Sequence, residues 1–185
     1  MEIISSNFLD TLFVSSLEQQ QIKQKRNRIV EAQQTGRVTV FLSHSHSDKK
    51  RIEAVVKIFN SVGIDIYVDW LDNEMQMVTN GRTADLIKTK IKSNKKFILF
   101  ASNIAIKSNW VNWELGIGDG AKYIDNMMIF PFREGNQNWT NNEYFEIYPH
   151  LEAESQYDSE TQRNVTFYVV YPNKSKYKLQ DWLKR

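Results

Sequence analysis

Short apolar runs alternate with amphipathic helical segments over most of this chain of 185 residues. Four runs read as strands: VTVFLS (38–43), DIYVDW (65–70), KFILFAS (96–102) and MMIFPF (127–132). Short, nearly continuous apolar runs are typical of strands that are buried on both faces. Helical spacing of apolar residues covers the segments between them, at about 48–61, 82–92 and 110–123. The alternation predicts a parallel sheet with helices on both faces.

A fifth strand, VTFYVVYP (165–172), and a last helical segment, LQDWLK (179–184), complete the predicted domain. Five such strands favour the flavodoxin-like order 2-1-3-4-5, in which the ligand lies outside the carboxyl ends of strands 1 and 3. The loops SHSHSD, WLDNE and SNIAIKSNW follow the first three strands and should line that edge. The segment 133–164 has no clear motif.

The first 36 residues differ from the rest of the chain. An apolar stripe at helical spacing is formed by Phe8, Leu9, Leu12, Phe13 and Leu17. The polar run EQQQIKQKRNR follows it. We therefore expect an N-terminal helical extension at 1–36 and the α/β domain at 37–185.

The amino-acid composition limits which binding partners and which cellular compartment we expect for the protein. The formal net charge is only +2, which favours neither nucleic acid nor an anionic membrane as a partner. The chain has no cysteine, which excludes disulfides and thiolate metal sites and fits a reducing compartment. No signal pattern begins the chain, and no apolar run approaches the roughly 20 residues of a membrane helix. We expect a soluble, cytoplasmic protein.

A carboxylate in an apolar helical face is the sharpest candidate for function. In SNWVNWELGIGDG (108–120), one predicted buried face comprises Trp110, Trp113, Glu114 and Ile117. Glu114 then either points partly to solvent, or pairs with a lysine such as Lys107, or lines a cleft at the ligand edge where this helix begins. Functional carboxylates are often held in such apolar surroundings.

Other motifs at this edge give weaker evidence for a function. The HSH sequence at His44–His46 lacks further nitrogen or sulfur ligands nearby, so we expect no metal site there. Its small polar residues suit contacts to a sugar or a phosphate better. The stretch GIGDGA (116–121) matches a dinucleotide fingerprint, but a helix precedes it where a strand is needed. Close packing of the helix on the sheet, or fraying of the helix toward its end, is the better interpretation of these glycines. Ser43, His44 and Asp48 are residue types of a catalytic triad, but they lie too close together in one loop.

Three stretches together resemble bacterial TIR (Toll/interleukin-1 receptor) domains. VTVFLSHSHSDK is similar to the first conserved box, and GIDIYVDWLD to the second strand and the start of the BB loop. KFILFASNIAIKSNWVNWEL is similar to the third strand followed by a W-x-x-x-E motif. The resemblance covers about residues 37–132. The BB loop, DNEMQMVTNGRT, departs from it because it lacks the proline of animal signalling domains and keeps only Gly81 as a match.

The resemblance implies an NAD-cleaving enzyme in which Glu114 is the catalytic residue. The residues expected to contact the substrate are Ser43, His44, Ser45, Asp69, Trp70, Ser102 and Trp110. NAD would be the substrate, with no separate cofactor. The products would be nicotinamide with ADP-ribose, a cyclic ADP-ribose isomer or an ADP-ribosyl conjugate.

The family also implies partners and a setting. They are self-association through TIR–TIR contacts, a downstream effector that responds to the nucleotide product, and antiphage defence of the Thoeris type. Two other functions remain open: a non-enzymatic TIR interaction module, and an N-glycosidic enzyme resembling nucleoside deoxyribosyltransferases.

Overall fold

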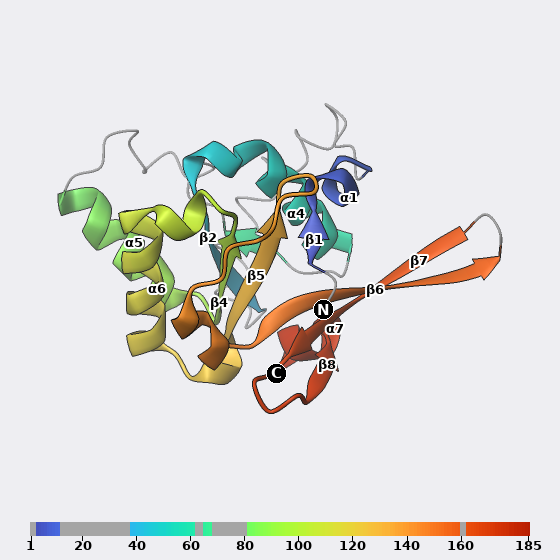
Figure 1. Cartoon of the computed structure of the whole chain (residues 1–185). Helices are drawn as coiled ribbons and strands as arrows, with labels where there is room; N and C mark the ends of the chain where they lie inside the picture. Colours follow the sequence, from blue (N-terminus) through green and yellow to red (C-terminus); the bar gives the residue numbers. More distant parts are fainter. Residues whose placement is uncertain (1–2, 12–37, 62–64, 68–80, 160–161) are drawn as a thin grey trace.

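The computed structural model describes residues 3–11, 38–61, 65–67, 81–159 and 162–185. They form one sheet of order β3-β2-β4-β5-β6-β7-β8, with β1 paired to β5 (Figure 1). The strands are β1 (Ile4–Ser5), β2 (Thr39–Ser43), β3 (Asp65–Tyr67), β4 (Lys96–Ala101), β5 (Met127–Arg133), β6 (His150–Ser159), β7 (Gln162–Val170) and β8 (Lys176–Lys178). The α-helices are α1 (Ser6–Thr11), α4 (Lys49–Ser61), α5 (Gly81–Ser93), α6 (Asn109–Ala121) and α7 (Leu179–Lys184). The short 3₁₀ helices are η1 (His46–Asp48), η3 (Ala105–Lys107), η4 (Ile124–Asn126) and η5 (Glu143–Ile147).

The first four predicted strands form the parallel half of the sheet. β2 pairs with β3 on one side and with β4 on the other, and β4 continues to β5, all in parallel. Every residue of β2 and β4 is buried, as their apolar sequences predict. The predicted fold class, a flavodoxin-like α/β sheet whose strand order reverses beside β2, is confirmed.

The C-terminal part of the sheet corrects the predicted number of strands. The run 165–172 falls mostly in β7, which is not a neighbour of β5. Strand β6 lies between them, parallel to β5 at the single pair Ile129↔His150 and antiparallel to β7 along its length. Sequence analysis missed β6 because its sequence, HLEAESQYDS, mixes polar and apolar residues. Hydrogen bonding to β7 in a hairpin, which projects from the body of the molecule in Figure 1, makes it a strand.

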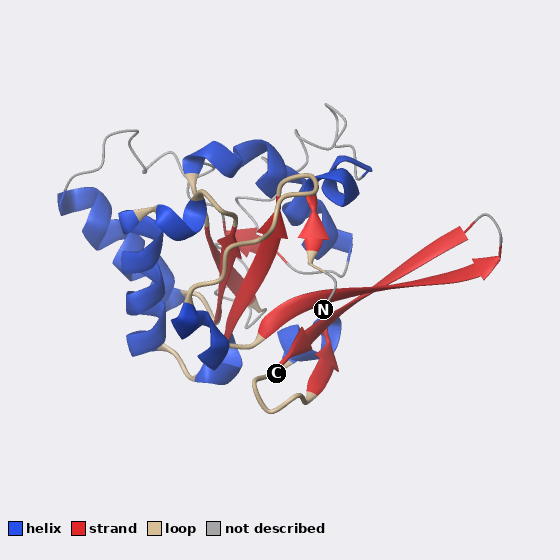
Figure 2. Ribbon diagram, viewed as in Figure 1, coloured by secondary structure: helices blue, strands red, loops and turns tan. Residues whose placement is uncertain are grey.

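Two apolar cores lie on opposite faces of the sheet, with helices on both sides (Figure 2). Residues of β4 alternate between them, since Ile98 and Phe100 belong to one core and Phe97 and Leu99 to the other. The first core also contains residues of α1, α4 and α7, and the second contains residues of α5 and α6. Among the described helices, none combines the length and the apolar character needed to cross a membrane.

The described N-terminal residues belong to the same fold. β1 pairs in parallel with the end of β5, at Ile4↔Phe132 and Ser5↔Arg133. Leu9 of α1 is 2% exposed and lies in the core that also contains α4. The rest of the predicted apolar stripe beyond Leu9, and the domain boundary at residue 36, lie outside the described residues.

Candidate active site

The Glu114 carboxylate lies at the carboxyl edge of the parallel strands. Ser43, the last residue of β2, donates its hydroxyl proton to Oε2 of Glu114 across 2.5 Å. Glu114 is 6% exposed and Ser43 is 1% exposed. Hydroxyl donors to ionised carboxylates form bonds of this length, which are stronger than neutral ones. Two motifs that sequence analysis picked out separately therefore meet in one buried contact.

Helix α6 carries Glu114 in its second turn. Ser108 is the N-cap, and its hydroxyl accepts a hydrogen bond from the backbone NH of Val111 at 3.4 Å. The buried residues of this helix are Val111, Glu114, Leu115 and Gly118. The helix thus presents Glu114 to the sheet, not to solvent.

The predicted buried face of α6 is partly wrong. Trp113 is 38% exposed, and Trp110 and Ile117 are only half buried. The reason is the close approach of the helix to β4 at Gly118, where an added Cβ would lie 3.0 Å from the Phe97 ring. Gly118 lets the helix approach the sheet closely at this point, and the buried face is formed by Val111, Glu114, Leu115 and Gly118. The contact at Gly118 supports the interpretation that the glycine motif allows close packing of the helix on the sheet.

A second buried polar cluster lies beside the first. Ser102, just after β4, donates its hydroxyl proton to Oδ2 of Asp48 at 2.7 Å and accepts a hydrogen bond from the backbone NH of Ala105 at 3.0 Å. Both Ser102 and Asp48 are buried. Burial raises the pKa of the Asp48 carboxyl, whereas the Ser102 hydrogen bond and the nearby His44 lower it. The cluster joins the loop after β2 to the loop after β4.

The two histidine rings of the HSH loop lie near each other, with centroids 6.3 Å apart. His44 is buried, and its Nδ1 lies 3.0 Å from the Leu42 carbonyl, which can only accept a hydrogen bond. Ser45 is the N-cap of η1 and accepts a hydrogen bond from the backbone NH of Ser47 at 3.3 Å, while His46 is exposed.

The helical segment predicted at about 48–61 is α4, which begins at Lys49, directly after Asp48. The Asp48 carboxylate accepts its hydrogen bond from Ser102. Sequence analysis missed the Asp48–Ser102 pair. Both residues follow strands that are adjacent and parallel, and this position in the sequence could have indicated that their side chains meet. Ser43 and Asp48, two of the triad residue types, thus bond to different partners.

Trp110 flanks the site without enclosing it. It is half buried at the first turn of α6 and packs against the core that contains Leu115. Its ring meets the Trp113 ring edge to face, with centroids 5.2 Å apart. Asp69, Trp70 and most of the BB loop, which were also expected near the substrate, lie outside the described residues.

Comparison with known proteins decides the family. The family model described as the TIR domain matches residues 40–162, which is more than half of the chain. The chain belongs to the TIR-domain family. The predicted resemblance is thereby confirmed, and Glu114 and Ser43 lie within the matched region.

Two curated relatives carry related names. One, from Bacillus cereus (strain MSX-D12), is named "Probable 3' cyclic ADP-D-ribose synthase ThsB'" and is 25% identical over 79% of this chain and 75% of its own length. Another, from Cytobacillus dafuensis, is named "Putative cyclic ADP-D-ribose synthase TIR2" and is 26% identical over 55% of this chain. The match spans 31% of that second protein. Among solved structures, a prokaryotic SEFIR domain covers 58% of this chain and 81% of its own, with a TM-score of 0.39 and 16% identity.

Proposed function

We propose that this TIR domain cleaves the bond between nicotinamide and ribose in NAD, with Glu114 as the catalytic residue. The observation that carries the proposal is a buried carboxylate, oriented by the Ser43 hydroxyl, at the edge of the sheet where α/β folds bind ligands. The names of the two relatives, both called cyclic ADP-D-ribose synthases, support the same substrate.

The chemistry explains how one carboxylate suffices. Ordinary glycosidases use a second carboxyl group as an acid for the leaving group. The nicotinamide of NAD is a pyridinium, so it becomes neutral when it takes the electron pair of the C–N bond. Positive charge then develops on the ribose, and a fixed carboxylate stabilises it. NAD is thus the substrate, and the reaction requires no separate cofactor.

Capture of the ribose carbon decides the product. Attack by water gives ADP-ribose, whereas attack by a hydroxyl of the same molecule closes a ring; in both cases a C–O bond forms and a proton is released. The relatives' names favour ring closure, so we propose a cyclic ADP-ribose isomer as the main product. Such a diffusible product suits a signal to a downstream effector in antiphage defence of the Thoeris type.

The decisive experiment is mass spectrometry of the products formed from NAD by the full chain. We expect free nicotinamide and a product with the mass of ADP-ribose less one water. Glu114→Gln should remove both, whereas Glu143→Gln, a change at an exposed glutamate of η5, should not. A folded Glu114→Gln protein with normal turnover would remove the catalytic assignment.

Two rival functions are separated by the same assay. A non-enzymatic TIR module would release no nicotinamide and would be indifferent to Glu114→Gln. An enzyme resembling nucleoside deoxyribosyltransferases would leave NAD intact and exchange bases on a panel of deoxynucleosides.

Self-association is proposed as the control of the activity. Several large apolar side chains are exposed near η3, α6 and η5, namely Ile104, Trp113, Tyr144 and Ile147. Contact between copies would cover such side chains and order the loops at the site. NAD turnover per molecule should then rise with protein concentration, measured beside light scattering for size. Constant turnover per molecule from a strict monomer would exclude this control.

A further inference from the structure

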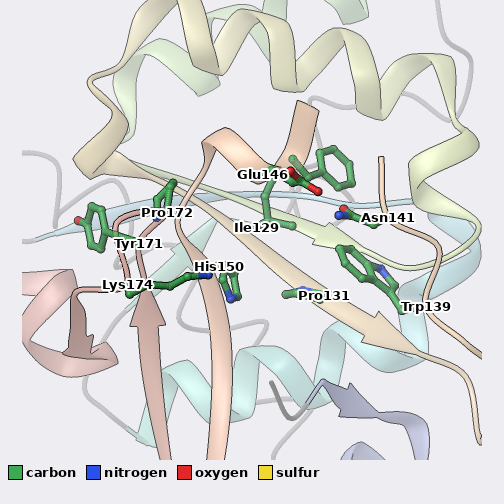
Figure 3. Close-up of a pocket in the computed structure, with 10 residues that line it drawn as sticks. Ile129, Pro131, Trp139, Asn141, Glu146, His150, Tyr171, Pro172 and Lys174 are labelled. Carbon is green, nitrogen blue, oxygen red and sulfur yellow. The ribbon is translucent and has the colours of Figure 1, made fainter. Parts of the chain in front are cut away.

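A pocket of about 420 Å³ lies between β5, η5 and the turn after β7, and Glu114 is not among its lining residues. Its lining residues are Ile129, Pro131, Trp139, Asn141, Phe145, Glu146, His150, Tyr171, Pro172 and Lys174 (Figure 3). The strand β4 separates β5 from β2, so this pocket contains none of the residues assigned to the Glu114 site. Its volume lies within the roughly 300–1,000 Å³ of small-molecule sites.

The pocket exists because β6 leaves β5 early. The two strands pair only at Ile129↔His150, and β1 pairs with β5 further along, at Phe132 and Arg133. Pro131 lies between these two points and has no backbone NH to offer a strand. The chain thus leaves a gap beside β5, and η5 and the turn at Tyr171–Lys174 border it.

One end of the pocket is a fixed aromatic wall. The rings of Trp139 and Phe145 are nearly parallel, 18° apart in plane, with centroids 6.3 Å apart. The indole NH of Trp139 donates to the Ala101 carbonyl at 2.6 Å, which locks the orientation of that ring. Asn141 lies on the same side of the pocket in Figure 3. A flat ring with polar edges fits such a wall, because aromatic faces favour stacking and an amide can both donate and accept.

The other end carries positive charge. Lys174 is held in a left-handed backbone conformation, with φ of 69°, which is uncommon for residues other than glycine. Its backbone NH closes a turn to the Tyr171 carbonyl at 2.9 Å, and Tyr171 donates to the Ser175 carbonyl at 2.8 Å. Figure 3 shows the Lys174 side chain directed along the pocket toward His150. His150 Nε2 lies 3.0 Å from Oε1 of Glu152, so the Lys174 ammonium is the group that suits a phosphate here.

We propose that this pocket is a second ligand site, distinct from the Glu114 site, that binds an anionic nucleotide of mononucleotide size. The base stacks near Trp139, where Asn141 meets its polar edge, and the phosphate lies at Lys174. The loop that carries Trp139 is also bonded to Asn103, through the Asn138 carbonyl at 3.1 Å and the Thr140 NH at 2.9 Å. Asn103 follows Ser102 directly, so the ligand would contact a segment attached to the polar cluster of Asp48 and Ser102.

The test is calorimetry on the full chain with adenosine 5′-monophosphate, adenosine and inorganic phosphate as probes. We expect the mononucleotide to bind one to one with a dissociation constant below about 1 mM, and each half alone to bind at least about tenfold more weakly. Binding should persist in Glu114→Gln, which separates this proposal from the proposed NAD chemistry. Loss of binding in that variant would assign the ligand to the Glu114 site instead.

Three variants test the placement of the charge. Lys174→Asn should weaken binding of the mononucleotide at least about tenfold, because asparagine tolerates the left-handed backbone but carries no charge. Lys176→Asn, at an exposed lysine of β8 outside the pocket, should leave it unchanged. Glu146→Gln should leave binding equal or tighter, whereas a cationic ligand would bind more weakly.

The Trp139 indole NH signal in an NMR titration gives a readout that does not depend on any variant. We expect it to shift on addition of the mononucleotide. No binding at about 1 mM, adenosine binding as tightly as the mononucleotide, or an unmoved indole signal would each overturn the proposal.

Discussion

Two charged side chains are buried at opposite ends of the same parallel strands, and they differ in what surrounds them. At the amino end, Lys96 is 0% exposed, donates to the Asp125 carbonyl at 3.0 Å and lies 4.3 Å from the centre of the Trp182 ring. At the carboxyl end, the Glu114 carboxylate accepts a hydrogen bond from the Ser43 hydroxyl at the end of β2. The partners of Lys96 come from η4 and α7, so its charge helps to attach the closing helix.

The contrast shows that burial of a charge does not by itself mark a functional site. Burial lowers the pKa of Lys96 to about 8. A buried cation is stabilised by ring faces and carbonyls, which α7 and η4 provide. Glu114 and Lys96 differ in their position in the fold. Only Glu114 lies at the carboxyl ends of the strands, outside which ligands of α/β sheets bind.

Removal of the Glu114 charge should have the largest effect on activity. Glu114→Gln keeps the shape of the side chain, and it should lower nicotinamide release by about 100-fold or more because the developing ribose cation loses its counter-charge. Thermal unfolding should show that the variant is folded. If Lys96→Met lowered turnover as much as Glu114→Gln does, the two buried charges would not differ in function, and the conclusion that only Glu114 serves catalysis would be wrong.

Loss of the Ser43 hydroxyl should have the next largest effect. Ser43→Ala removes a hydrogen bond to a carboxylate and should lower kcat about tenfold, since Glu114 loses its orientation. Ser43→Thr, which restores a hydroxyl, should recover most of the loss. A purely structural role would instead lower stability in Ser43→Ala and leave kcat of the folded protein unchanged.

Trp110→Ala should lower kcat/KM about fivefold, because the substrate loses one aromatic contact at the start of α6. The ring is half buried, so the loss of stability should be smaller than the about 3–5 kcal/mol of a fully buried tryptophan. Tyr123→Ala, at an exposed aromatic residue just after α6, is the control. Equal effects of the two changes on kcat/KM would show that Trp110 has no special place at the site.

The smallest effect concerns the amino end of the strands and the pH dependence of stability. Because the folded pKa of Lys96, about 8, is below its usual 10.5, the unfolded chain binds more protons between these values. The destabilising effect of the buried charge is therefore complete below pH 8 and is lost as the pH rises toward 10.5. Lys96→Met should reduce the rise in unfolding free energy between pH 8 and about 9.5 by at most about 1.4 kcal/mol per pH unit.

Denaturant unfolding over that range measures the slope, and Lys92→Met provides a control at an exposed lysine of α5. Lys122, whose pKa burial also lowers, contributes with the same sign in all three proteins. Identical slopes for wild type and Lys96→Met would show that Lys96 titrates normally.

The parallel half of the fold and the two residues of the Ser43–Glu114 contact could be recognised from the amino-acid pattern. Continuous apolar runs such as those of β2 and β4 allow few alternatives, because they must be buried on both faces. Helical spacing likewise identified α6 as the helix that carries Glu114. The W-x-x-x-E motif and the polar loop after β2 could both be recognised in the sequence. The predicted strand order places them at the same edge of the sheet.

Three features could not be predicted from the amino-acid pattern: which face of α6 is buried, the bond between Asp48 and Ser102, and the place of β6 between β5 and β7. Each depends on a contact between residues far apart in the chain, such as Gly118 on Phe97 or His150 beside Ile129. The periodicity of apolar residues in α6 predicts which residues share a helix face. Which of two neighbouring faces packs on the sheet depends on contacts such as that of Gly118 with Phe97. A mixed strand such as β6 gains its structure from hydrogen bonds to its partner, which its own sequence does not encode.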